Sequence, residues 1–171
     1  MKKIAIVTGG AGNDIITIDG GSDTVKDLGG AGGTDDDVVI INNGTTLNAT
    51  DIIGFTATTG TQNNSTGATN AVLNAKNGVD VTIDVASAGG SSKAFKLVGG
   101  TGKDSLTGGA GNDIILGNNA NDTLKGNDGN DVLTGGAGND TLYGGNGDDI
   151  FNISSGSDII KDLSTGDDVI I

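Results

Sequence analysis

Short runs of alternating polar and apolar residues recur every nine residues in the second half of the chain. From Gly99 onward, each nine-residue unit joins a turn-forming stretch to a triplet with an apolar centre, as in GGAGNDIIL at 108–116. A triplet of this kind predicts a very short strand with one inward side chain, and the glycines before it predict a tight turn. The inward residues are Leu106, Ile115, Leu124, Leu133, Leu142, Phe151, Ile160 and Val169.

Eight such units in succession form a repeat, and the repeat predicts stacking. Two units make one coil of eighteen residues, with a strand on each side and a turn at each end. Successive coils place equivalent strands side by side at about 4.8 Å, so these strands run parallel. The predicted fold class is therefore all-β, a parallel β-roll or β-solenoid.

The first part of the chain carries a shorter array, followed by a stretch without the repeat. GGAGNDIIT at 9–17 is followed by IDGGSDTVK at 18–26, whereas residues 41–98 are rich in Thr, Asn and Ala. Within that stretch, Val79, Val81, Ile83 and Val85 alternate with polar residues, which predicts a half-buried strand. We expect four parts: an N-terminal short array and cap (1–40), a β-rich spacer (41–98), six nonapeptides (99–152) and degenerate terminal coils that cap the stack (153–171).

Aspartate occupies the sixth position of every unit. One predicted column holds Asp104, Asp122, Asp140 and Asp158, the other holds Asp113, Asp131, Asp149 and Asp167, and Asp14 and Asp23 have the same position near the N-terminus. Carboxylates about 5 Å apart repel by roughly 1 kcal/mol in water, and by more where water is excluded. Turn chemistry explains a single Asp, whose side chain caps its own backbone. Eight in phase favour a shared cation.

The opening MKKIAIVTGGAGNDII is also similar to the first strand and phosphate loop of a nucleotide-binding fold. Such a fingerprint appears once per domain and needs a third glycine, which Ile15 replaces here. The residues after Asp14 alternate rather than follow a helical period. Because GGAGND recurs at 108–113 and 135–140, we interpret the stretch as a loop for a metal ion.

Composition narrows the choice of ligand. The net charge is −13, with 22 acidic residues that are all Asp, which argues against nucleic acid and anionic membranes as partners. No apolar run approaches membrane-spanning length, so we expect no membrane insertion. The sequence has no His, Cys, Glu or Arg, so zinc, copper and haem sites are disfavoured and oxygen-liganded cations remain.

Calcium fits the spacing of the predicted columns. Calcium–oxygen distances are about 2.3–2.6 Å, so two oxygens on opposite sides of one ion lie about as far apart as two strands. Magnesium demands shorter and stricter coordination. We therefore predict several Ca²⁺ ions between stacked turns, with carbonyl groups of the glycine turns completing each shell.

The units at 99–152 resemble GGxGxDxUx, the signature of the repeats-in-toxin (RTX) calcium-binding family. The resemblance implies a parallel β-roll with calcium held between loops by the sixth-position Asp residues and by loop carbonyls. Carried over, the carbonyl ligands are those of Gly10, Gly12, Gly100, Gly102, Gly109, Gly111, Gly117, Asn119, Gly126, Gly129, Gly135, Gly138, Gly144 and Gly147. Several units depart from the signature: Asn118 and Ala120 replace glycine in GNNAND, and ISSGSD and DLSTGDD have lost most of theirs.

The resemblance also implies a role. Family members are typically exported unfolded by type I secretion and fold outside the cell on meeting calcium. We therefore expect an extracellular or cell-surface segment of a larger bacterial-type protein with a structural, secretion-linked function. Alternatives are a calcium-dependent recognition module, such as an adhesin or glycan-binding unit, and the non-catalytic tail of an exported enzyme. We do not expect the chain itself to be an enzyme, because its acid–base and nucleophile options are few.

Overall fold

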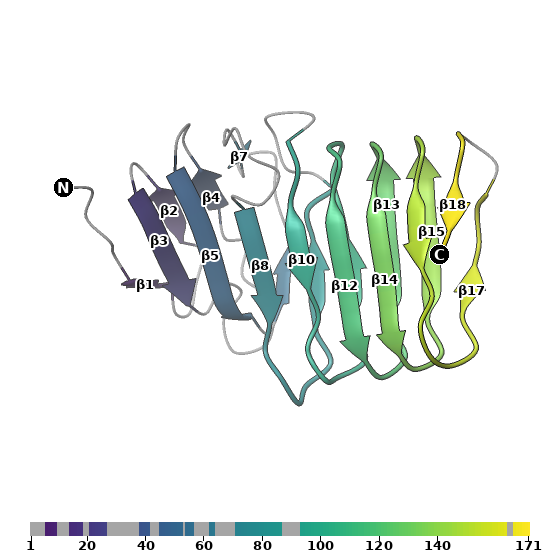
Figure 1. Ribbon diagram of the computed structural model, residues 1–171. Coiled ribbons are helices and arrows are strands. Elements are labelled where there is room, and N and C mark those ends of the chain that lie inside the picture. The colour runs from purple at the N-terminus through teal and green to yellow at the C-terminus, as the bar shows by residue number, and fades with distance from the viewer. Residues whose placement is uncertain are drawn as a thin grey trace.

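The protein is a stack of β coils in which every paired strand runs parallel to its neighbours (Figure 1). The computed structural model describes residues 6–9, 14–18, 21–26, 38–41, 45–52, 54–56, 62–63, 71–86, 93–163 and 166–171. Within these residues all regular structure is strand, which confirms the predicted all-β, parallel fold class.

The strands are β1 (Ile6–Thr8), β2 (Ile15–Ile18), β3 (Gly21–Lys26), β4 (Val38–Ile41), β5 (Thr45–Ile52), β6 (Gly54–Thr56), β7 (Gln62–Asn63), β8 (Ala71–Ala75), β9 (Thr82–Asp84), β10 (Lys96–Val98), β11 (Ser105–Thr107), β12 (Ile114–Asn119), β13 (Thr123–Asp128), β14 (Val132–Ala137), β15 (Thr141–Asn146), β16 (Ile150–Asn152), β17 (Ile159–Ile160) and β18 (Val169–Ile170). They form three sheets. The nine-stranded sheet has the order β1-β3-β5-β8-β10-β12-β14-β16-β18, the six-stranded sheet β17-β15-β13-β11-β9-β6, and the three-stranded sheet β2-β4-β7.

The nonapeptide region folds as two facing sheets with coils of eighteen residues, as predicted. In the six-stranded sheet, Leu106 pairs with Leu124 and Leu124 with Leu142. These inward residues are fully buried, and with their counterparts in the nine-stranded sheet they form one narrow core between the two sheets. Large aromatic residues are scarce, so this core depends on aliphatic side chains repeated once per strand.

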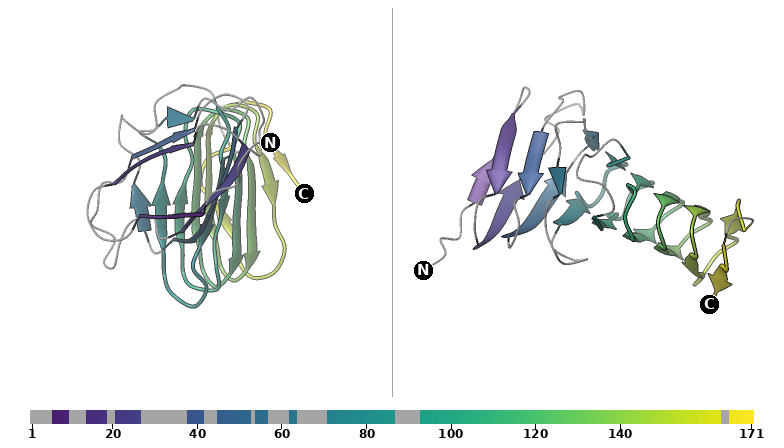
Figure 2. Two further views of the ribbon diagram at one scale, coloured as in Figure 1. Left: turned by 90° about the vertical axis from the view of Figure 1, so that its left-hand side faces the viewer. Right: turned by 90° about the horizontal axis from the view of Figure 1, so that it is seen from above.

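The nine-stranded sheet continues without a break through the predicted spacer. Thr24, Asn48, Val72 and Lys96 are successive partners, 24 residues apart, and the next partner, Ile114, follows after 18. The early coils are therefore longer by six residues, and the third sheet, β2-β4-β7, lies in this part of the stack (Figure 2). The four-part division of the chain stays a prediction, but one sheet crosses all of its boundaries.

The predicted strand around Val79–Val85 is confirmed in its centre. Val81, Ile83 and Val85 are buried on either side of and within β9, whereas Val79 is exposed in the preceding turn. Strand β9 pairs with β11, so the spacer supplies the coil on which the first nonapeptide stacks.

The last coil differs from the prediction by one residue. Ile150 pairs with Val169 and Phe151 with Ile170, a spacing of 19, so Ile170 takes the inward place predicted for Val169. An extra residue in the turn between β17 and β18 causes this shift. Leu163, Val169 and Ile170 remain about half exposed, so the stack ends in an uncovered apolar edge.

Candidate metal site in the turns

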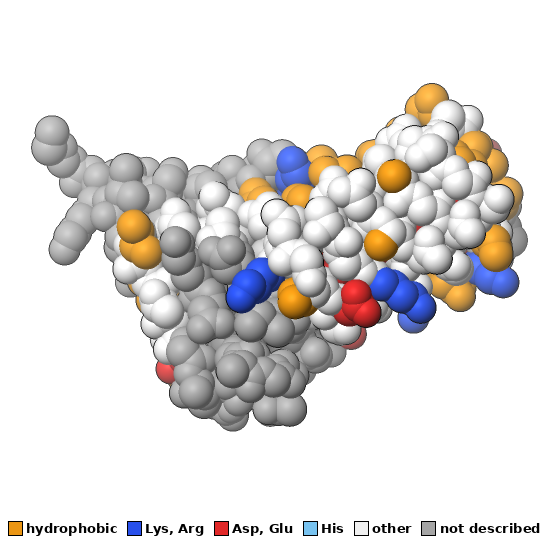
Figure 3. All heavy atoms as spheres, turned by 90° about the horizontal axis from the view of Figure 1, so that it is seen from below, with side chains coloured by type: hydrophobic (Ala, Val, Ile, Leu, Met, Phe, Trp, Pro, Cys, Tyr) orange, Lys and Arg blue, Asp and Glu red, His pale blue; other side chains and the backbone are white. Residues whose placement is uncertain are grey.

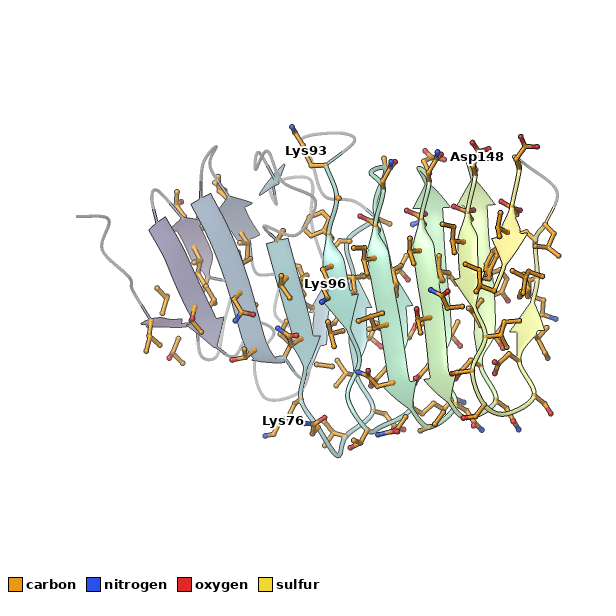
Figure 4. The ribbon with its side chains drawn as sticks, in the orientation of Figure 1. Lys76, Lys93, Lys96 and Asp148 are labelled. Atoms are coloured by element: carbon orange, nitrogen blue, oxygen red, sulfur yellow. The ribbon has the colours of Figure 1, made fainter. Side chains whose placement is uncertain are left out.

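The turns that carry the sixth-position aspartates form two rows on opposite long edges of the stack. We use the word turn for the first six residues of each unit, which include the end of the preceding strand in β12 to β15. The lower row contains 99–104, 117–122, 135–140 and 153–158, and the upper row contains 108–113, 126–131, 144–149 and the described residues 162–163 and 166–168. Lys76, just before the lower row, and Asp148, in the upper row, mark the two edges in Figure 4. Each row stacks a turn directly upon the equivalent turn of the preceding coil.

Eight aspartates form the two columns, with one change from the prediction. In each column the backbone N–H of one Asp donates to Oδ1 of the Asp in the next coil, at 2.7–3.0 Å. The columns are Asp104, Asp122, Asp140 and Asp158 below, and Asp113, Asp131, Asp149 and Asp168 above. Asp168 accepts from Asp149, so the prediction that Asp167 continues the upper column is wrong, because the last turn contains one extra residue. Asp167 instead donates its N–H to Asp148 on the exposed edge.

The two N-terminal aspartates lie outside these columns. In the nine-stranded sheet, Asp23 pairs with Leu47, and the same row continues through Ala71 and Phe95 before reaching Asp113. Asp14 precedes β2 and thus belongs to the three-stranded sheet. The structure therefore does not bring Asp14 or Asp23 together with the eight. Gly10 and Gly12 lie outside the described residues.

The conformation of the turns divides the rows into two groups. In the four units from 117 to 149, the second and fourth positions have left-handed φ angles, including Asn118 at 79°, Ala120 at 75° and Asn127 at 81°. No residue of the turns 99–104 and 108–113 has such an angle, although both match the glycine pattern fully. We expected glycine to decide this conformation. In the structure, Ala120 has a left-handed φ angle, at a cost of about 1 kcal/mol, whereas Gly100 and Gly102 do not.

Glycine at the first position has a different cause, which is close approach. A Cβ on Gly117 would collide with Oδ2 of Asp122 and with the carbonyl oxygen of Gly135 in the next coil. A Cβ on Gly126 would likewise collide with Asp131 Oδ2 and with the Gly144 carbonyl. At each of these glycines, a carboxylate oxygen of the same turn therefore lies close to a carbonyl oxygen of the next coil.

The carbonyl groups at the fourth position face the same intercoil space. The carbonyl oxygens of Gly129, Gly138 and Gly147, all predicted ligands, lie against the fourth-position glycine of the following turn. The second-position carbonyls of Asn118 and Asn127 do the same against Gly136 and Gly145. These two carbonyls were missed, because the prediction followed glycine rather than position in the unit.

The carboxylates themselves are buried and incompletely satisfied. Among the described residues, Oδ2 is buried without a hydrogen-bond partner in Asp122, Asp131, Asp140, Asp149 and Asp158. In Asp104 and Asp113, by contrast, Oδ2 accepts the N–H of Gly100 and of Gly109, both at 2.6 Å. A buried carboxylate oxygen without a partner is costly, so five of the eight turns present an oxygen that is available to a bound cation.

Burial also raises the pKa values of these carboxyl groups. Desolvation raises the pKa of Asp131 to about 8, with further upward contributions from the charges of Asp113 and Asp149. Desolvation likewise raises the pKa of Asp122 to about 6, and the neighbouring Asp104 and Asp140 add to it. Repulsion along the columns is therefore present, as predicted, although loss of hydration is the larger cause.

Acidification is expected to stabilise the calcium-free fold. A carboxyl group with a raised folded-state pKa binds its proton more tightly in the folded chain, so stability is lost as pH rises from about 4 through about 8. Thermal unfolding in a chelator should show a midpoint that falls over this range. In Asp131→Asn, the part of this fall above about pH 6 should be smaller. A midpoint that rises with pH would contradict the burial of ionisable groups described above.

The donor set fits a calcium ion better than a transition metal. Within the described part of the chain, no group of three or more His, Cys, Asp or Glu side chains could hold a metal by itself. Carbonyl oxygens must therefore supply most of any shell, as hard cations such as Ca²⁺ accept. Figure 3 looks onto the lower edge, where little acidic side chain reaches the surface, since the columns lie beneath the turns.

Comparison with known proteins points to the same repeat. The RTX calcium-binding nonapeptide repeat, in four copies, matches residues 6–25, 96–124 and 125–160, which together make up about half of the chain. No curated protein and no solved structure gives a significant match. In the described residues, no helix is long and apolar enough to span a membrane.

Proposed function

Because the chain belongs to the family of RTX calcium-binding nonapeptide repeats, we propose that its two rows of turns hold several Ca²⁺ ions between successive coils. The ligands are the sixth-position carboxylates together with carbonyl groups of the turns above and below. A bound cation supplies the positive charge that offsets a column of buried carboxylates. The observation that carries the proposal is the set of buried Oδ2 atoms without hydrogen-bond partners.

The pairing of oxygens from neighbouring coils supports ions at these places. Asp131 Oδ2 and the Gly144 carbonyl meet at Gly126, and Asp122 Oδ2 and the Gly135 carbonyl meet at Gly117. The cation would join two coils that otherwise press like charges together. Calcium binding and folding of the stack would therefore be one process.

The biological role proposed for the chain is structural. It would be the calcium-binding β-roll of a larger secreted or cell-surface protein, exported through type I secretion, as is typical of the family, and folded outside the cell. Extracellular calcium modules have Kd values of about 10⁻⁴–10⁻³ M, so such a segment stays unfilled at cytosolic calcium. Neighbouring domains of the parent protein are the proposed partners; a glycan ligand for 41–98 stays a prediction. We propose no catalysis, in keeping with the structural character of the repeat.

A calorimetric titration tests calcium binding directly. Calcium added up to about 10 mM should bind with a stoichiometry of several ions per chain and midpoints between about 0.1 and 1 mM. Magnesium at the same concentration should bind far more weakly, because it demands shorter distances and sheds water reluctantly. Absence of heat and of bound calcium after equilibrium dialysis would refute the proposal.

A further inference from the structure

In two of the interturn spaces of the nonapeptide region, an asparagine side chain donates a hydrogen bond to a first-position carbonyl of the preceding coil. We define a boundary as the space between one turn and the equivalent turn of the next coil. The first lower boundary lies between 99–104 and 117–122, and the first upper boundary lies between 108–113 and 126–131. Each begins at a unit with glycine at all three signature positions, GGTGKD for the lower boundary and GGAGND for the upper one.

In each of these boundaries, the side-chain amide of an asparagine in the later coil points to the earlier coil. Asn118 Nδ2 donates to the carbonyl oxygen of Gly99 at 2.6 Å, and Asn127 Nδ2 donates to that of Gly108 at 2.7 Å. Both asparagines occupy the second position of their unit, where the signature has glycine. Each amide therefore uses a first-position carbonyl that faces the intercoil space.

In the earlier coil of each boundary, both oxygens of the aspartate accept a backbone N–H. Oδ1 of Asp113 accepts the N–H of Phe95 at 2.7 Å, and Oδ2 accepts the N–H of Gly109 at 2.6 Å. Asp104 is held in the same way by Val81 and Gly100. Asp131 Oδ1 accepts the N–H of Asp113 across the first upper boundary, but Asp131 Oδ2, which lies with the Gly144 carbonyl at Gly126 on the side of the next upper boundary, has no partner.

The next lower and next upper boundaries have no such side chain at the second position. At the second position the next turns have Gly136 and Gly145, where a Cβ would collide with the carbonyls of Asn118 and Asn127. Asn118 and Asn127 instead bond to 99–104 and 108–113, the two turns without left-handed φ angles. Gly102 lies against Val79, and Gly111 lies against Lys93. The coils that these two turns stack on therefore lack the nonapeptide.

From these contacts we infer that Asn118 and Asn127 seal the first lower and first upper boundaries against calcium, so that the ion array begins at Asp122 and Asp131. The inference rests on the proposed calcium binding and specifies where it occurs. In a sealed boundary, a side-chain amide and a backbone N–H donate hydrogen bonds to the oxygens that a cation would bind in the other boundaries. Two turns that match the calcium signature would thus be structural turns without metal.

Asp113→Asn and Asp131→Asn form a matched pair for the test. Both residues are buried in the upper row, and in both Oδ1 accepts a backbone N–H from the preceding coil. They differ in Oδ2, which is hydrogen-bonded only in Asp113. Calcium per chain should be counted by elemental analysis after equilibrium dialysis. We expect Asp113→Asn to bind as many ions as the unchanged protein and Asp131→Asn to bind at least one fewer.

Asn127→Gly gives a second test that does not depend on weakening the fold. Glycine tolerates φ near 80°, so the turn keeps its conformation while the sealing amide is removed. The variant should gain one calcium ion. An unchanged count in Asn127→Gly, or loss of an ion in Asp113→Asn, would overturn the inference while leaving the proposed function intact. Absence of calcium from the unchanged protein would instead refute the proposed function itself.

Discussion

Adding calcium to the metal-free chain is expected to produce an ordered β-roll and a large gain in stability. Each site at ten times its Kd stabilises the folded state by about 1.4 kcal/mol, so about four sites contribute about 5–6 kcal/mol. That gain is comparable with the whole stability of many domains. Without calcium, the columns are buried carboxylates that lack counter-charge, so at neutral pH far-UV circular dichroism should show less β structure and unfolding should begin at a lower temperature.

The comparison needs spectra and unfolding curves in a chelator and in about 10 mM calcium. For a chain of this length, the expected gain raises the unfolding midpoint by about 10–20 °C. Magnesium at equal concentration controls for ionic strength and should give only a small part of the shift. Superimposable spectra together with equal midpoints would show that the stack does not depend on the ion.

Leu124→Ala is expected to be the most damaging single truncation of the core. Leu124 is fully buried in β13 between Leu106 and Leu142, at the centre of a core only two sheets thick. Large residues that could shift into the space are scarce, so the cavity should persist. Truncations of this kind cost about 2–5 kcal/mol. The unfolding midpoint in saturating calcium should fall by about 5–20 °C.

Thr123→Ala provides the matched control. Thr123 is the preceding residue of the same strand, only partly buried on the outer face, and its backbone N–H bond to Asp104 does not involve the side chain. Its replacement should change stability by less than about 1 kcal/mol. Equal losses in the two variants would mean that the inward row does not carry the packing energy of the stack.

The sequence was sufficient to predict the coils of the nonapeptide region. Period, inward residue and column position all follow from a nine-residue unit, because a strand of three residues can turn only one side chain inward. Leu106, Leu124 and Leu142 stack as expected, and so do Asp104, Asp122 and Asp140. Each repeat of this pattern indicates the same register, since a slip of one residue would expose every inward side chain.

The conformation of individual turns could not be predicted in this way. Ala120 adopts a left-handed φ although it replaces the fourth-position glycine of its unit, and Gly102 does not although its unit is complete. The two complete units without left-handed φ angles are those that stack on coils lacking the nonapeptide, and a local motif does not encode such a long-range contact. The hydrogen bonds from Asn118 and Asn127 depend on that same contact.

Two errors of register have a shared physical origin. The last turn gained a residue, which moved Asp168 into the place predicted for Asp167. The early coils gained six, which hid the row Asp23, Leu47, Ala71 and Phe95 from a search for nine-residue units. In both cases loop length changed while strand pairing was kept, because insertions in turns cost little and lost pairing costs much.

The unbroken nine-stranded sheet makes the length of the molecule adjustable. Each strand pairs only with the strands of the coils before and after it, so removal of residues 126–143 would bring Ile115 beside Phe151 with every inward side chain still inward. Duplication of the same residues would do the reverse. The length of such a molecule changes by about 4.8 Å for each coil of eighteen residues that is added or removed. Its reach can therefore change without the invention of a new fold.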